Sequence, residues 1–250
     1  MEEVPVIMPG LAGRRVLITG AAQRLGAAIA RAFAESGSAV VVHCFRSRED
    51  AEKLAASLPP CPAPLRHEVV TCDLADPDAV RRMAEAVGPV DCLVNNAAMW
   101  IRGDAPQSEL DRQETVNHLA PCGLIRLFAR MRPQEREFSA VNILDAATLS
   151  DSAPATPYDA AKIALRRDTL VLARELAPHT RVNAVAPGPV FPPRELGGAG
   201  MKHIPATLPL KRPVAPEDVA RAVVFLASAP SVSGAVLPVD CGQSLLSRQP

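Results

Sequence analysis

The 250-residue sequence has few aromatic side chains and no long hydrophobic run. Aromatic residues make up 3% of it, with one tryptophan, Trp100, and one tyrosine, Tyr158. No segment approaches the ~18 consecutive apolar residues that cross a bilayer, which excludes a membrane-spanning helix. The acidic start MEEVPVIMPG lacks the positive and apolar regions of an export signal. We therefore expect a cytoplasmic protein with no membrane partner.

An excess of one charge and a pattern of paired cysteines are also missing. The 27 basic and 27 acidic side chains balance, so no basic excess points to nucleic acid. The six cysteines are scattered, without C-x-x-C pairs or the histidine spacing of a zinc site. We expect reduced thiols, no metal site and no nucleic-acid partner.

Strand-like apolar runs alternate with amphipathic helical stretches along the chain. The runs lie at residues 16–19, 39–43, 69–72, 92–95, 140–144, 182–185 and 235–239. The helical stretches lie at residues 25–36, 48–57, 76–86, 111–130, 158–176 and 216–227. Such alternation is typical of a parallel sheet covered by helices on both faces. The length and the 48% hydrophobic content fit one α/β domain.

A long segment rich in proline and glycine, residues 187–213, interrupts this pattern near the C-terminus. Loops of such length in a compact domain are usually functional lids or disordered segments. We expect a substrate-covering loop at about residues 189–206.

The stretch RRVLITGAAQRLGAAIARAFAESG places a strand, a tight turn and a helix in succession. Gly20 can adopt backbone angles that other residues avoid, and Gly26 lets the helix pack close to the sheet. Free N–H groups at the start of such a helix hold a pyrophosphate. The middle glycine of the usual turn is replaced by Arg24. The sequence therefore predicts a dinucleotide site.

The end of the second strand indicates which dinucleotide is bound. An acidic residue at this place would hydrogen-bond the adenosine ribose of NAD, but His43, Arg46 and Ser47 are found instead. An arginine with a hydroxyl fits a 2′-phosphate, so we predict NADP(H) as the cofactor. The alternative is that Arg46 and Ser47 only begin the following helix in solvent.

Tyr158 precedes Lys162 by four residues and follows Asp145 by thirteen. A tyrosine and a lysine at i and i+4 of a helix project from one face and can act on one substrate atom. Asp145 is the third polar group of this arrangement. Its alternative is a structural one, because aspartate often caps the turn after a strand.

Several ordered motifs resemble the short-chain dehydrogenase/reductase family from about residue 11 to residue 245. They are TGAAQRLG at 19–26, CDL at 72–74, NNAA at 95–98, VNHLAP at 116–121, YDAAK at 158–162 and APGPV at 186–190. The resemblance implies a doubly wound seven-stranded parallel sheet, the Rossmann fold, in one domain. It also implies a small-molecule substrate and a homotetramer.

Within that family the chain is most similar to pteridine reductases. These resemble it in the arginine of the glycine turn, in H-x-x-R-S after the second strand, and in an aspartate thirteen residues before the tyrosine. Two positions depart from that subgroup, because Ala98 stands where it has a serine and Trp100 where it has a phenylalanine. The aromatic plane for a pterin is kept and a hydroxyl contact is lost.

The resemblance, residue by residue, implies three sets of site residues. The catalytic set is Asn117, Asp145, Tyr158 and Lys162. The cofactor-binding set is Gly20, Arg24, Leu25, Gly26, His43, Arg46, Ser47, Asp73, Leu74, Asn96, Ala97, Tyr158, Lys162, Pro187, Gly188 and Val190. The substrate-binding set is Arg24, Ala98, Trp100, Asp145 and Tyr158.

These residues suggest how a substrate is reduced. A charged Lys162 beside Tyr158 favours the phenolate, which lowers the pKa of the tyrosine and makes it a better proton donor. Asn117 would hold a water that refills the proton chain. An ionised Asp145 only accepts hydrogen bonds and repels a developing alkoxide, which disfavours simple ketones. A pteridine offers N–H donors and needs a proton on a ring nitrogen.

We therefore predict an NADPH-dependent pteridine reductase for substrates of the biopterin, dihydropterin or dihydrofolate type. The alternative in the same class is a carbonyl reductase acting on 3-oxoacyl thioesters or a cyclic ketone. The alternative in another class is a non-catalytic NADP(H)-binding sensor on the same fold, since a fold does not fix a function.

Overall fold

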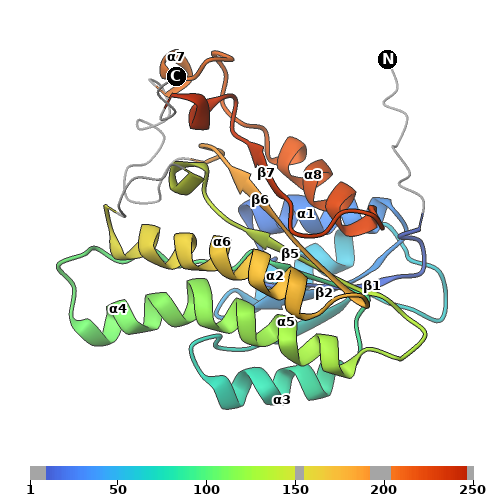
Figure 1. Cartoon of the computed structure of the whole chain (residues 1–250). Coiled ribbons are helices and arrows are strands. Elements are labelled where there is room, and N and C mark those ends of the chain that lie inside the picture. Colours follow the sequence, from blue (N-terminus) through green and yellow to red (C-terminus); the bar gives the residue numbers. More distant parts are fainter. Residues whose placement is uncertain (1–9, 150–154, 192–203, 247–250) are drawn as a thin grey trace.

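The computed structural model describes residues 10–149, 155–191 and 204–246. Seven parallel strands form one sheet with the order β3-β2-β1-β4-β5-β6-β7 (Figure 1). They are β1 Arg15–Ile18, β2 Ala39–Cys44, β3 Glu68–Thr71, β4 Cys92–Asn95, β5 Phe138–Ile143, β6 Thr180–Pro187 and β7 Val236–Val239. The predicted doubly wound α/β fold in one domain is confirmed, and each predicted strand is found within two residues of its expected start.

Helices cover both faces of this sheet (Figure 1). The helices α1 (Arg24–Glu35), α2 (Arg48–Ser57) and α8 (Pro216–Ser228) pack on one face, and α3 (Pro77–Val87), α5 (Ala120–Met131) and α6 (Pro157–Glu175) on the other. Alternate strand residues face opposite layers: Ile18 packs with α1, and Leu17 with α3 and α5. Burial on both faces explains why the strands read as continuous apolar runs rather than alternating ones.

One predicted helix, residues 111–130, is longer and less regular in the structure. It consists of α4 (Gln107–Glu114), a π-helical turn η1 (Thr115–Leu119) and α5. Pro121 lies in the first turn of α5, where it has no N–H to donate into the helical ladder. Single π turns inside helices are rare and are often found at functional sites. This one contains Asn117 and His118.

Side-chain caps fix where two helices begin. Asp76 accepts hydrogen bonds from the N–H groups of Asp78 and Ala79 at the start of α3. Thr156 and Asp159 form a reciprocal capping box at the start of α6, with Pro157 in its first turn. The capping box therefore sets the first turn of α6, which carries Tyr158.

The remaining short elements lie at the carboxyl edge of the sheet. They are η2 (Ala146–Leu149), α7 (Ile204–Thr207) and η4 (Gln243–Leu245). Most of the predicted substrate-covering loop at residues 189–206 lies outside the described residues, so it stays a prediction. No helix in the described part of the chain is both long enough and apolar enough to cross a bilayer.

Candidate active site

The strand order reverses between β1 and β4, and most of the predicted site residues follow the carboxyl ends of the strands or lie at the start of a helix. In open α/β sheets the crevice outside the carboxyl ends of the strands at this point is the usual ligand site. The turn after β1, the loops after β4 and β5, and the start of α6 all open onto this edge. The parallel arrangement brings together residues that are more than 100 positions apart in the sequence.

Two glycines make room for the chain to turn tightly after β1. Gly20 has φ +62°, and a Cβ there would lie 2.9 Å from the Cα of Ala97. A Cβ at Gly26 would collide with the carbonyl oxygen of Gly20 and lie 2.7 Å from the Nδ2 of Asn96. The turn therefore tolerates no larger side chain, and it leaves a cradle at the start of α1 that fits a pyrophosphate.

Asn96 holds this turn from the neighbouring strand. Its Nδ2 donates to the carbonyl oxygens of Thr19 (2.9 Å) and Gly20 (3.0 Å), and its own N–H donates to the Thr19 hydroxyl (3.0 Å). The N–H of Ala97 also donates to that hydroxyl (3.0 Å). Asn96 and Ala97 thus fix the shape of the cradle, and Thr19 is a partner that sequence reasoning missed.

Arg24 occupies the place of the missing glycine and has a positive φ of 52°, which is unusual for a residue with a side chain. Its guanidinium lies 5.0 Å from the centre of the Phe191 ring, in the segment after β6. Leu25 follows it, half-buried. The stacking links the first turn of α1 to the segment that begins the predicted substrate-covering loop. No sequence motif pointed to Phe191.

The segment after β6 completes this side of the crevice. Pro187 ends β6 and is buried, and the N–H of Gly188 donates to Val239 O (3.0 Å). A Cβ at Gly188 would lie 2.8 Å from the Cα of Asp240. Val190 packs against the same core layer as α1. The predicted role of these residues in cofactor binding stays a prediction.

The end of β2 presents the side chains predicted for a 2′-phosphate. Arg46 is exposed, and Ser47 is the residue before α2 but makes no side-chain cap to that helix. Asp73 and Leu74 follow the adjacent strand β3, with Leu74 buried and Asp73 half-buried. Arg46 and Ser47 therefore lie together after β2, and their predicted contact with a 2′-phosphate stays a prediction.

The structure contradicts the prediction that His43 binds the cofactor. His43 is only 1% exposed, and both of its ring nitrogens have protein partners. Its Nδ1 accepts from the N–H of Gly20 (3.1 Å), so Nε2 carries the proton and faces Cys72 O at 3.1 Å. Burial is the main cause that lowers its pKa to about 4. His43 is a neutral structural tie between β1, β2 and β3.

This burial predicts a pH-dependent stability. Between pH 6.5 and 4 the unfolded chain binds a proton at His43 that the folded protein does not, so stability falls as pH falls. The full contribution is about 3 kcal/mol at pH 7 and is lost by about pH 4. Urea unfolding at pH 7 and pH 5 is expected to show a flatter pH dependence for His43→Gln than for wild type. Identical pH dependence of the two proteins would contradict this.

The catalytic candidates meet at the end of β5 and the start of α6. Lys162 is 2% exposed and its Nζ donates to Ile143 O at 2.8 Å. The same Nζ lies 5.8 Å from the centre of the Tyr158 ring. Asp145 comes two residues after β5, and its Oδ1 accepts from the N–H of Ala147 (2.9 Å). The lysine therefore ties α6 to the strand that presents Asp145.

Burial is the largest cause of the pKa shifts of Lys162, Asp145 and Tyr158. It lowers the pKa of Lys162 to about 8, although the charge of Asp145 acts in the opposite direction. It raises the pKa of Asp145, against the hydrogen bond from Ala147 and the charge of Lys162. It also raises the pKa of Tyr158, and Asp145 and Asp159 add to that effect. The predicted lowering of the Tyr158 pKa is therefore not found, and the phenol remains protonated at neutral pH.

A pocket of about 410 Å³ opens beside Tyr158. Its lining residues come from the loop after β4, from the end of β5 and from the first turn of α6: Ala98, Met99, Trp100, Asp145, Thr156, Tyr158 and Asp159. Trp100 is 53% exposed, so its ring is accessible to a ligand. Thr156 and Asp159 were not predicted here, although their T-x-x-D spacing is a signal for a helix start.

Two buried amides fix the loop that carries Trp100. Asn117 accepts from the N–H of Met99 (2.9 Å) and donates to its carbonyl (2.8 Å). Gln113 accepts from the N–H of Ile101 (2.5 Å). Both amides are fully buried. The side chain of Asn117 thus positions the pocket wall, and its predicted role in holding a water stays a prediction. Gln113 was missed.

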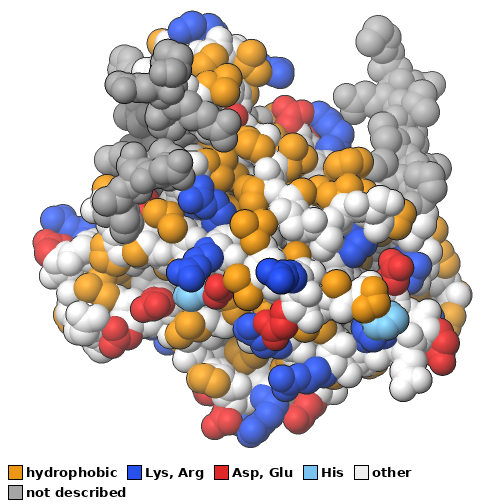
Figure 2. Space-filling model, viewed as in Figure 1, with side chains coloured by type: hydrophobic (Ala, Val, Ile, Leu, Met, Phe, Trp, Pro, Cys, Tyr) orange, Lys and Arg blue, Asp and Glu red, His pale blue; other side chains and the backbone are white. Residues whose placement is uncertain are grey.

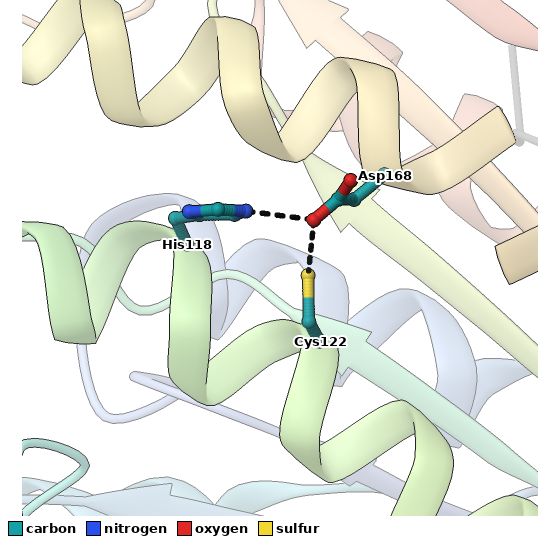
Figure 3. A group of neighbouring side chains, drawn as sticks. All are labelled: His118, Cys122 and Asp168. Carbon is teal, nitrogen blue, oxygen red and sulfur yellow. Dashed lines mark hydrogen bonds and ion pairs between the residues drawn. The ribbon is translucent and has the colours of Figure 1, made fainter. Parts of the chain in front are cut away.

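A second polar group joins η1 and α5 to α6 (Figure 3). His118 Nε2 and Cys122 Sγ face the same oxygen of Asp168, at 2.8 and 3.6 Å. Among the described residues, these side chains bring ligand atoms within 4.8 Å of one another, as a metal ion requires. Burial and Asp168 raise the pKa of Cys122 to about 12, which disfavours the metal-binding thiolate. We interpret the group as a hydrogen-bonded tie between the helices.

The outer face of α5 and α6 mixes apolar and charged side chains (Figure 2). Leu119 of η1 and Leu170 and Val171 of α6 are each about half exposed. Arg126 and Glu175 form an ion pair across the two helices at 2.9 Å. Such a surface fits the helix contacts expected for an oligomer, and a solvated helix face equally well.

The chain is similar to known proteins over nearly its whole length. A family model described as enoyl-(acyl carrier protein) reductase matches residues 20–244. L-xylulose reductase from Mus musculus is 34% identical over 244 residues, which cover 93% of this chain and 97% of that protein.

Two solved structures are similar over nearly the whole chain. FolM alternative dihydrofolate reductase 1 from Brucella canis, complexed with NADP, has a TM-score of 0.82 and 30% identity, with 96% of this chain and 98% of that one covered. The angucycline C-6 ketoreductase LanV with bound NADP has a TM-score of 0.83 and 25% identity, with 94% and 97% covered. By its sequence motifs, its fold and these relatives, the chain belongs to the short-chain dehydrogenase/reductase family.

Proposed function

We propose that this protein is an NADPH-dependent reductase of a pteridine, of the biopterin, dihydropterin or dihydrofolate type. The reaction class follows from the family and from neighbours that bind NADP. The observation that carries the substrate class is the position of Asp145. A carboxyl group of raised pKa lines the pocket together with Tyr158 and Trp100.

The residues present fit the cofactor. The cradle at Gly20 and Gly26 accepts a pyrophosphate, and Arg46 with Ser47 suits a 2′-phosphate. When bound, the nicotinamide supplies the hydride. The protein must therefore bind and orient the two reactants and deliver a proton.

Tyr158 is the proton donor. Its phenol is protonated at neutral pH because burial, Asp145 and Asp159 raise its pKa. Lys162 is held by Ile143 O and lies beside the Tyr158 ring, so its positive charge stabilises the phenolate left after proton transfer. Below about pH 8 this lysine is charged, which sets an upper limit to the working range.

Asp145 selects a nitrogen heterocycle. Most members of the family have a serine at the position of Asp145. The serine hydroxyl donates a hydrogen bond to the carbonyl oxygen of the substrate. A carboxylate accepts from the amino edge of a pteridine, and the protonated acid assists proton delivery to a ring nitrogen. Burial raises the pKa of Asp145, so the acid form persists to higher pH than in an exposed aspartate.

Trp100 provides a flat surface for the ring. It lines the pocket, half of its surface is exposed, and its backbone is held between the bonded residues Met99 and Ile101. Stacking of an aromatic heterocycle on an indole adds to the energy of area burial. A ring stacked on Trp100 lies within the same pocket as Asp145 and Tyr158.

One observation favours a carbonyl reductase as the second candidate. The Oδ1 of Asp145 accepts from the N–H of Ala147, as it does in a turn-capping aspartate. In that case the carboxyl shapes the turn after β5, and Tyr158 alone protonates a ketone oxygen. The ketoreductase LanV shows that a neighbour of this fold acts on a carbonyl.

A substrate panel separates these functions. NADPH oxidation is measured with dihydrobiopterin, dihydrofolate, an acetoacetyl thioester and a cyclic ketone. We expect turnover with at least one pteridine and little with the carbonyl compounds. Turnover of carbonyl compounds alone would establish the second candidate. Tight NADPH binding without turnover of any compound would instead indicate a sensor.

Variants of Asp145 test the role of the acid. Asp145→Asn keeps an oxygen for the Ala147 N–H but removes the ionisable group. We expect pteridine kcat/KM to fall about 10–100-fold, because a hydrogen bond to a charged group contributes about 1.5–3 kcal/mol. NADPH affinity should stay within about twofold. Asp104→Asn, at an exposed aspartate outside the pocket lining, is the matched control and should have little effect. Full pteridine activity in Asp145→Asn would refute the proposal.

The same proposal covers the quaternary structure. The face of α5 and α6 with Leu119, Leu170 and Val171 is the surface we expect to bury in a homotetramer. Sedimentation of the purified protein measures the number of subunits.

A further inference from the structure

Arg112, which belongs to none of the predicted site sets, reaches the adenosine end of the crevice from α4. Its Nη2 donates to both carboxylate oxygens of Asp73, at 2.8 and 2.7 Å. Arg112 is 36% exposed at its side chain and Asp73 26%, so the pair is partly shielded from solvent. The two residues are 39 positions apart in the sequence.

The sheet brings Asp73 next to the phosphate-binding side chains. In the register of β2 and β3, Cys44 pairs with Thr71, and the N–H of Cys72 donates to Cys44 O (3.1 Å). The residues that follow each strand therefore lie side by side. Arg46 and Ser47 leave β2 at the same edge where Asp73 leaves β3. The positive charge of Arg46 contributes to lowering the pKa of Asp73.

An acidic group at this place conflicts with a bound phosphate. A carboxylate close to a 2′-phosphate repels it, and this effect favours the unphosphorylated dinucleotide. In this structure burial raises the pKa of Asp73, but the hydrogen bonds and charges of Arg112, the N–H of Ala75 and the charge of Arg46 outweigh it. The pKa of Asp73 is therefore lowered, so its negative charge is present and needs a partner.

Phe45 links the two arginines. The guanidinium of Arg46 lies 4.8 Å from the centre of its ring and that of Arg112 lies 5.5 Å away. Both distances are within the range of a cation–π contact. Phe45 is 42% exposed and comes directly after β2. The Phe45 ring thus holds both guanidinium groups at the edge of the sheet where Arg112 already neutralises Asp73.

We infer that Arg112 is a positioning residue for cofactor selectivity: its ion pair with Asp73 removes the repulsion that Asp73 would exert on a 2′-phosphate held by Arg46 and Ser47. This inference rests on the proposed use of NADP(H). It assigns to α4 a role in choosing the dinucleotide.

Direct binding to the full-length protein tests this without turnover. Isothermal titration measures NADP⁺, NAD⁺, adenosine 2′,5′-bisphosphate and 5′-AMP against wild type and Arg112→Gln. We expect Arg112→Gln to bind both 2′-phosphorylated ligands about tenfold more weakly, with NAD⁺ and 5′-AMP within about twofold. Equal losses for all four ligands would indicate a merely structural role and overturn the inference.

The double variant Arg112→Gln/Asp73→Asn identifies the mechanism. If Arg112 acts by neutralising Asp73, removal of the acid restores the wild-type preference for the 2′-phosphorylated ligands to within about threefold. Persistent loss in the double variant would overturn the inference. Arg102→Gln, which breaks the exposed ion pair with Asp104, is the matched control and should change nothing.

Failure of the inference and failure of the proposed cofactor give different results. Wild-type protein that binds NADP⁺ no better than NAD⁺ would refute the use of NADP(H), and the inference with it. Wild-type protein that prefers NADP⁺, together with an Arg112→Gln variant of unchanged preference, would overturn the inference alone. Thermal unfolding of each variant confirms that it is folded.

Discussion

Replacement of Tyr158 by phenylalanine is expected to lower kcat about 10²–10⁴-fold, the usual contribution of a positioned proton donor. The phenol is half-buried, lines the pocket and stays protonated at neutral pH because burial raises its pKa. Phenylalanine keeps the ring that lies beside Lys162 and removes only the hydroxyl. The measurement is single-turnover NADPH oxidation with the best substrate of the panel.

The same variant must still bind the cofactor. The cradle at Gly20 and Gly26 does not involve the Tyr158 hydroxyl, so the NADPH dissociation constant should stay within about twofold of wild type. NADPH binding to both proteins is measured by quenching of the fluorescence of Trp100, the single tryptophan. Unchanged kcat would refute the proton-donor role, and a lost binding signal would show that the variant had disturbed the crevice.

Replacement of Gly26 by alanine is expected to abolish productive cofactor binding. The added methyl collides with Gly20 O and lies 2.7 Å from Asn96 Nδ2 and 2.8 Å from Ala21 Cα. Backbone atoms do not move aside easily, so the turn must open and its N–H groups shift. Overpacking of this kind costs about 1–3 kcal/mol of stability. A displacement of about 1 Å in a positioning element lowers activity about 10²-fold.

Gly123→Ala is the matched control for this variant. Gly123 lies within α5, is exposed, and a Cβ there would meet no atom within 4 Å. Alanine in a helix is favoured over glycine by up to about 1 kcal/mol, so this variant should be slightly more stable than wild type. Urea unfolding and NADPH titration are measured for both. Wild-type affinity in Gly26→Ala would contradict the close packing of the turn.

Local patterns in the sequence predicted most of the fold correctly. The strands are buried on both faces, so their apolar runs stand out against the amphipathic helices between them. The helices expected at residues 76–86 and 216–227 begin at Pro77 and Pro216, within one residue of the expected start. The single helix expected at residues 111–130 is interrupted by a π-helical turn, which no pattern in the sequence had indicated.

The candidate site was predictable where it depends on short-range spacing or on a recognised motif. Tyr158 and Lys162 are one turn apart on α6, so their common face follows from helix geometry. The glycine turn between β1 and α1 is also local. The prediction for His43 was wrong because its burial depends on β1 and β3, which pack on either side of β2.

The sequence by itself determined the α/β class, the position of the glycine turn and the Tyr158–Lys162 pair, because each depends on backbone geometry within a few residues. Only the tertiary structure decided the contacts of Arg112 with Asp73, of Gln113 and Asn117 with the loop of Trp100, and of Arg24 with Phe191. It also decided that the pKa of Tyr158 is raised rather than lowered. The physical reason is that burial and the charges of distant residues act through space, and their distances exist only once the sheet has brought the chain together.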